Sequence, residues 1–92
     1  MYTTTTLTAI PYGNAKVHIY EDGTIVLISY TTPVAYIEAD GRLIVRGLYS
    51  ATTRKHIGAF VREYARIDYQ TAKRFYEHDE AYNIYTGEVT RI

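Results

Sequence analysis

The sequence predicts an α+β domain in which a four-stranded antiparallel meander is packed by one main helix, with a shorter second helix and a C-terminal strand or hairpin. Residues 14–47 contain strand-like segments separated by two Asp-Gly pairs, which are strong hairpin signals. Residues 50–66 have a hydroxyl-rich start and apolar residues at helical spacing. With 92 residues, 47% of them hydrophobic, the chain is expected to form one domain with a modest core.

The first thirteen residues are expected to form an extended arm or an edge strand. Residues 3–6 are four consecutive threonines, whose β-branched side chains favour extended structure. Pro11 and Gly13 end this segment. In residues 16–20, Val17 and Ile19 alternate with Lys, His and Tyr, which is typical of a half-buried strand.

Residues 24–30, TIVLISY, are apolar on both faces, as expected of a central strand that is covered on both sides. Pro33 interrupts the pattern, and residues 34–38 and 42–46 then supply the third and fourth strands. One helix cannot cover both faces of this sheet. Either the second helix and the C-terminal strand wrap the far face, or two chains share that face in a symmetric dimer.

The main helix is predicted to begin among Ser50, Thr52 and Thr53, whose hydroxyls accept hydrogen bonds from free N–H groups. Its apolar stripe, at positions i, i+3, i+4 and i+7, consists of Ile57, Phe60, Val61 and Tyr64. The opposite side carries Lys55, Arg62 and Arg66. This basic ridge is interpreted either as a solvated face with cations near the helix C-terminus or as a surface for an anionic partner.

A second helix is predicted over residues 68–78. Asp68 is its expected N-cap, and helical spacing relates Tyr69, Ala72, Phe75 and Tyr76. Residues 77–83 are expected to form a loop. Residues 82–92 are then expected to form a last strand or a short hairpin about Gly87.

The charges are balanced overall but segregated along the chain. Ten basic and ten acidic side chains give no net charge, and six of the basic ones fall within residues 54–74. This balance disfavours a DNA mimic and leaves a local basic patch. The sequence has no apolar run of membrane-spanning length, and its N-terminus lacks the pattern of a signal peptide. The absence of cysteine fits a cytoplasmic protein.

Tyrosine is unusually frequent, with 11 among 92 residues, which is more than a core of this size is expected to hide. Tyrosine and arginine are common anchors of protein interfaces. A partner-binding surface is therefore predicted from Lys55, Arg62, Arg66, Tyr69, Arg74, Tyr76, Tyr82 and Tyr85.

The start of the main helix is a second candidate site. Hydroxyls and N–H groups followed by cations are suited to hold a phosphate or a carboxylate, and helix capping alone also explains the same residues. The candidate anion-binding residues are Ser50, Thr52, Thr53, Arg54 and His56. The three histidines lack metal-ligand spacing, and neither a nucleophile–base pattern nor a Gly-rich phosphate loop is present. No catalytic residue, metal or cofactor is therefore predicted.

Two motifs recur in order in the middle of the chain. The first, SY-x-T-x-VA, consists of Ser29, Tyr30, Thr32, Val34 and Ala35. The second, YS-x-TT-x-x-H, consists of Tyr49, Ser50, Thr52, Thr53 and His56. Together they resemble a family of small, mostly phage-encoded proteins of uncharacterised function, over about the middle half of the chain. The resemblance implies a phage or mobile-element protein that acts inside a bacterial cell.

By analogy with other small phage proteins, the resemblance implies a non-enzymatic inhibitor of a host defence system, of the anti-CRISPR or another anti-defence type. The expected partner is a host protein, such as a defence nuclease or its complex, contacted in the bacterial cytoplasm and away from any membrane. A homodimer is a further expectation. The alternative is a nucleotide or nucleic acid bound at residues 50–56, as in a sponge for a signalling nucleotide. A third class is a purely structural or assembly role.

Overall fold

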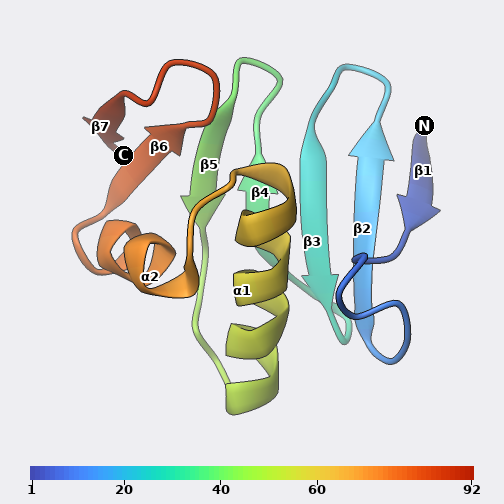
Figure 1. Ribbon diagram of the computed structural model, residues 1–92. Helices are drawn as coiled ribbons and strands as arrows, with labels where there is room; N and C mark the ends of the chain where they lie inside the picture. The colour runs from blue at the N-terminus through green and yellow to red at the C-terminus, as the bar shows by residue number, and fades with distance from the viewer.

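The computed structural model describes residues 1–92 as a seven-stranded antiparallel sheet with two helices on one face (Figure 1). The strands are β1 (Tyr2–Thr5), β2 (Ala15–Tyr20), β3 (Ile25–Ser29), β4 (Thr32–Ile37), β5 (Arg42–Val45), β6 (Glu80–Asn83) and β7 (Val89–Arg91). Helices α1 (Ala51–Tyr64) and α2 (Tyr69–Glu77) connect β5 to β6. The strands lie in the sheet in sequence order, so the sheet is one continuous meander.

The predicted α+β class and its two helices are confirmed, but the predicted number of meander strands is too small. β1 pairs with β2, and the β6–β7 hairpin extends the other edge. The loop predicted over residues 77–83 is wrong in part, because Glu80–Asn83 pairs with β5. β1 is an edge strand, and β6 lies next to the edge strand β7, so backbone hydrogen bonds hold both, and the polar sequences YTTT and EAYN can form them without a strong apolar pattern.

Pro33 lies inside β4 and not before it. The register between β3 and β4 shifts at Leu27 and Ile28, and Pro33 stands opposite Ile28. A bulge of this kind tolerates a residue without an N–H donor. It also turns both Val34 and Ala35 into the core, where each is fully buried.

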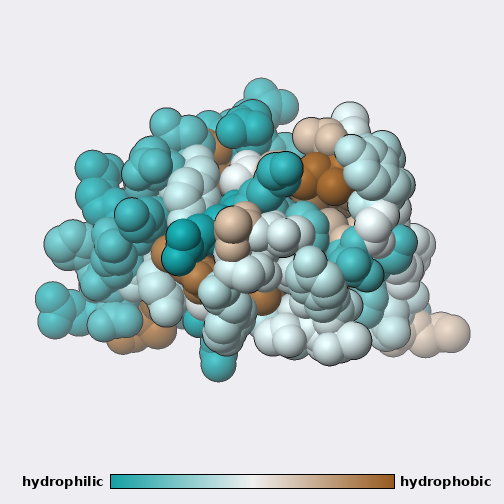
Figure 2. All heavy atoms as spheres, turned by 90° about the horizontal axis from the view of Figure 1, so that it is seen from below, coloured by the Kyte–Doolittle hydropathy of each residue, from teal (hydrophilic) through white to brown (hydrophobic).

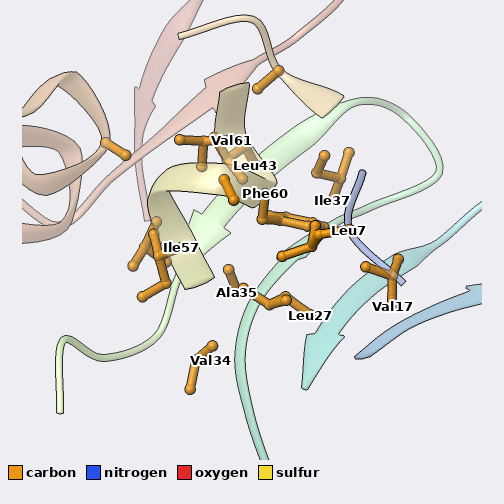
Figure 3. Close-up of a cluster of buried hydrophobic side chains, with 14 of the residues drawn as sticks. Leu7, Val17, Leu27, Val34, Ala35, Ile37, Leu43, Ile57, Phe60 and Val61 are labelled. Atoms are coloured by element: carbon orange, nitrogen blue, oxygen red, sulfur yellow. The ribbon is translucent and has the colours of Figure 1, made fainter. Parts of the chain in front are cut away.

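Helix α1 closes the core as its apolar spacing predicts. Ile57, Phe60 and Val61 are fully buried, and Tyr64 is half-buried against them. Figure 3 shows Phe60 extending from α1 toward Leu7 and the sheet. Ala59 is also buried, although its place in the sequence is on the basic side of the helix. The buried face of α1 is therefore wider than the predicted stripe.

Helix α2 packs on the same face of the sheet as α1. It contacts α1, β5 and β6, and the ring of Phe75 stacks on Tyr82 with 5.3 Å between centroids. Tyr82 stands opposite Leu43, a residue of the core beneath α1. The second helix therefore does not wrap the far face of the sheet, and that face has no second layer. Neither helix is long and apolar enough to cross a bilayer.

The segment between β1 and β2, residues 6–14, returns over the helix side of the sheet and is called the N-terminal arm below. Leu7 is fully buried in the core, which anchors the arm. The backbone N–H of Thr8 donates to Oε1 of Glu63 on α1 at 2.7 Å. Two contacts, one apolar and one polar, therefore hold the arm beside the helix.

Candidate functional site

A buried hydrogen-bond network joins β3 to the start of α1. Oγ of Ser29 lies 3.1 Å from Oγ1 of Thr53 and 2.9 Å from Nδ1 of His56. Ser50 caps the helix, since its Oγ accepts from the backbone N–H of Thr53 at 3.1 Å. The Ser50 hydroxyl also donates to Oγ1 of Thr53 at 3.2 Å. Of the five candidate anion-binding residues, Ser50, Thr53 and His56 are thus engaged within the protein, and Arg54 donates from Nε to the carbonyl of Leu48 at 3.4 Å.

His56 reaches the surface through only one edge of its ring. The residue is 4% exposed, and its Nδ1 faces Ser29. Burial lowers the pKa of His56 below its ordinary value, and the neighbouring Lys55 cation lowers it further, so the ring is neutral at pH 7. No hydrogen bond reaches Nε2, and no buried side-chain polar atom lacks a partner, so Nε2 opens onto the adjoining pocket.

That pocket lies between the N-terminal arm and the first turns of α1. It has a volume of about 230 Å³ and is lined by Ile10, Tyr12, Gly13, Asn14, Thr52, Lys55 and His56. Its polar groups are an imidazole edge, an ammonium, a hydroxyl and an amide. These groups can donate hydrogen bonds to a small carboxylate or phosphate.

A larger hollow continues from this pocket along α1. It has a volume of about 520 Å³ and shares Ile10, Tyr12 and Lys55 with the pocket. Its other lining residues are Ala9, Ala51, Arg54, Gly58, Ala59, Arg62 and Tyr69. We call the pocket and the hollow together the arm groove. Gly58 forms part of the floor, and Tyr69 stands close enough that an added Cβ at Gly58 would lie 3.4 Å from the Tyr69 Cβ.

The cations of the arm groove have no acidic partner. The one ion pair of the molecule joins Arg42 to Glu38 at 3.3 Å, outside the groove. Glu63, the nearest acid on α1, is occupied by the arm through the Thr8 N–H. Arg54, Lys55 and Arg62 therefore present positive charge along one side of the groove, and none of them forms an ion pair.

Asp68 precedes the groove residue Tyr69 in the chain, and it caps α2. Its Oδ1 accepts from the backbone N–H of Thr71 at 2.8 Å. Hydrogen bonds from Thr71 lower the pKa of Asp68, and the Arg62 cation lowers it further. The carboxylate thus serves the helix start and does not neutralise Arg62 by a direct contact.

The structure gathers only part of the predicted partner surface. Lys55, Arg62 and Tyr69 line the arm groove together with the candidate anion residue Arg54. The other predicted residues do not line it: Arg66 and Arg74 are exposed, Tyr76 and Tyr82 are half-buried, and Tyr85 is 73% exposed beside Gly41. They form no single site with the groove residues.

The groove residues contributed by the N-terminal arm, Ile10 and Tyr12 among them, were not predicted from the sequence. The Pro-Tyr-Gly turn at residues 11–13 is the only local signal for them, and it does not show where the arm lies.

Viewed from below (Figure 2), hydrophilic residues gather on the side of α2, β6 and β7, and the side of the N-terminal arm is more apolar. The arm groove therefore combines cations with aromatic and apolar surface.

Residues 1–78 match the model of a family described as "Family of unknown function (DUF8033)". The matched segment includes β1–β5, both helices and every residue of the arm groove. No curated protein and no solved structure matches the chain.

Proposed function

The chain belongs to this family of unknown function, and we propose that it is a non-enzymatic binding protein that engages an acidic partner through the arm groove. One observation carries the proposal: Arg54, Lys55 and Arg62 line one groove without any acidic partner, between the tyrosines Tyr12 and Tyr69. Tyrosine rings give contact area at low entropic cost, and arginine supplies directed hydrogen bonds to carboxylates.

A binding role also accounts for the Ser29–His56 contact better than catalysis does. The Ser29 hydroxyl is 2% exposed and is shared with Thr53, so an outside substrate has no path to it. No carboxylate hydrogen-bonds the His56 ring to orient it as a base. The pair therefore fits a role in holding the helix start beneath the groove.

The partner that we propose is a protein of a bacterial host. The resemblance of the two sequence motifs to phage-encoded proteins suggests a phage or mobile-element origin and action in the host cytoplasm. Within this setting, the acidic partner is a defence protein, such as a nuclease or its complex, which the chain inhibits by contact in the manner of an anti-CRISPR or other anti-defence protein.

The test is capture of the partner from a defence-bearing host by the tagged protein, followed by mass spectrometry. The double variant Lys55→Glu/Arg62→Glu should lose the captured protein, because both substitutions put negative charge into the groove. The matched control Lys73→Glu/Arg91→Glu makes the same change in net charge outside the groove and should retain capture. Equal capture by the wild type and by Lys55→Glu/Arg62→Glu would refute the proposal.

A nucleotide or nucleic acid is the second candidate, because the small pocket brings Thr52, Lys55 and the open edge of His56 together. Tyr12 at its rim is suited to stack on a base. A panel of nucleotides in a thermal-shift assay tests this function. A rise in melting temperature that disappears in Lys55→Glu and weakens with added salt favours it, and no rise with any nucleotide or oligonucleotide refutes it.

A further inference from the structure

The face of the sheet opposite the helices carries an apolar row across its middle strands. Val26 of β3 pairs with Tyr36 of β4, and Tyr36 pairs with Ile44 of β5. Their neighbours along the strands, Leu27 and Ile37, belong to the core beneath α1. Because successive side chains in a strand point to opposite faces, the row points away from both helices. Neither helix covers this face, and Val26 and Tyr36 are part-exposed on it, whereas Ile44 is only 6% exposed.

The row continues into an aromatic cluster at the β1 side of the same face. His18 pairs with Val26, and the ring of Tyr2 stacks on His18 with 4.2 Å between centroids and an interplanar angle of 21°. Tyr20 lies 5.1 Å from Tyr2, again between ring centroids. Ile28, two residues from Val26, extends the apolar surface along β3. A one-layer sheet usually shows polar side chains to water, so this surface is unusual for a solvated face.

The size of the face fits a homodimer interface. The two longer extents of the molecule, 32 and 30 Å, lie along the layers, and the short one, 19 Å, is the thickness of sheet plus helices. An ellipse with the two longer axes has an area of about 750 Å², which is the outline of the whole face, and a standard interface buries roughly 800 Å² of accessible surface per partner. A dimer interface of standard size would therefore use most of this face.

The charges of the face suit a second copy better than a charged partner. Strand alternation places Lys16, Glu38 and Arg42 on this face, outside the apolar row. Glu38 and Arg42 already form an ion pair with each other. The face thus has an apolar centre and little net charge, which is the pattern of homodimer interfaces and offers nothing specific to a strongly acidic or basic partner.

We infer that a second copy of this chain covers the open sheet face in a symmetric, face-to-face dimer whose centre is Val26, Ile28 and Tyr36. The sheets of the two copies then pack as the inner layers of a four-layer molecule, with the helices outside. Each arm groove faces outward and stays accessible. The inference uses no residue of the groove, so the failure of one proposal leaves the other standing.

The test is the mass of the full chain in solution at micromolar concentrations, by sedimentation equilibrium. The wild type should have twice the mass of the chain, and Val26→Lys should have the mass of one chain. The control Ile19→Lys replaces another β-branched residue of the sheet, which is 36% exposed on the helix side of β2, and it should remain a dimer. A monomeric wild type would overturn the inference.

A second measurement covers the case in which Val26→Lys fails to fold. A soluble paramagnetic probe added to the wild type should leave the methyl signals of Val26 and Ile28 nearly unbroadened, because the second copy excludes the probe. The methyl signal of Ile19 should broaden strongly. Strong broadening of the Val26 and Ile28 methyls in a dimeric wild type would show that the copies meet elsewhere, and it would overturn the proposed face.

Discussion

The hydroxyl of Ser29 lies 2.9 Å from Nδ1 of His56, and this buried contact joins β3 to α1 across 27 residues of sequence. Thr53 completes the network from the first turn of the helix. The two sequence motifs, SY-x-T-x-VA and YS-x-TT-x-x-H, therefore meet in space. Hydrogen bonds between residues of the two motifs hold the start of α1 on the sheet, next to the pocket that His56 lines.

Removal of the Ser29 hydroxyl should destabilise the fold. Ser29→Ala leaves Nδ1 of His56 and Oγ1 of Thr53 with one partner fewer, so the free energy of unfolding should fall by about 1–3 kcal/mol. Urea unfolding followed by circular dichroism measures the change. Thr31→Ala, at an exposed turn position beside β3, is the control and should change the free energy by less than about 0.5 kcal/mol.

The stability should depend on pH through His56. Its folded-state pKa lies below the unfolded value of 6.5, so the unfolded chain binds the proton more tightly. The contribution of the neutral ring is fully present above pH 6.5 and is lost as the pH falls from 6.5 through the lowered folded pKa. The free energy of unfolding, measured by urea titration between pH 8 and about pH 5, should therefore decrease toward the acid side.

Two single variants, each of which replaces one histidine with asparagine, test whether this pH dependence comes from His56. His56→Asn keeps a polar group near Ser29 but does not titrate, so its unfolding free energy should lose the His56 part of the slope. His78→Asn, at an exposed position after α2, should keep the wild-type slope. Identical slopes in the wild type and His56→Asn would contradict the assigned role of His56.

The arm should loosen when its polar anchor is removed. Glu63→Ala deletes the acceptor of the Thr8 N–H, whereas Glu63→Gln keeps a carbonyl oxygen at the same place. Hydrogen exchange of the Thr8 amide should become faster by about tenfold or more in Glu63→Ala, for a lost bond worth about 1.4 kcal/mol, and change little in Glu63→Gln. Unchanged protection in Glu63→Ala would show that Leu7 alone holds the arm.

Gly41 should resist substitution for two separable reasons. Its φ of +99° is unfavourable for any other residue, and an added Cβ would lie 2.5 Å from Cδ2 of Tyr85. Gly41→Ala should lower the free energy of unfolding by about 1–2 kcal/mol from the backbone alone, and by more with the ring in place. In a thermal or urea comparison, Gly41→Ala/Tyr85→Ala should recover only the part due to the ring, because the added Cβ still lies 2.9 Å from Oδ1 of Asn83 and the backbone angle is unchanged. Full recovery would mean that the backbone angle costs nothing.

Local patterns in the sequence were sufficient to predict α1, α2 and the central strands. The Ser50 cap and the Ile57–Phe60 spacing are set within a few residues, so they can be read without knowledge of the fold. For the first thirteen residues, the β-branched threonines predicted extended structure and left an arm and an edge strand as alternatives. β6 was expected to be part of a loop, because EAYN has no apolar alternation and its partner β5 lies on the other side of both helices in the sequence. The predicted break at Pro33 failed because a bulge in β4 accommodates it.

The candidate site shows the same division between local and distant information. Lys55, Arg62 and Tyr69 could be identified from residue type and helical position. Tyr12 could not be placed beside them, because the position of the arm depends on the burial of Leu7 and on the Thr8–Glu63 hydrogen bond, which spans 55 residues. A distant contact of this kind leaves no periodic signal in the sequence.

The central claim, that the arm groove is the binding surface, is tested most directly by chemical-shift mapping of the ¹⁵N-labelled protein with its captured partner. If the partner binds in the arm groove, the largest shift changes should fall on residues 9–12 and on α1 from Arg54 to Arg62. The double variant Lys55→Glu/Arg62→Glu should abolish these shift changes. Shift changes confined to the C-terminal tyrosines Tyr82 and Tyr85, with the groove resonances unmoved, would contradict it.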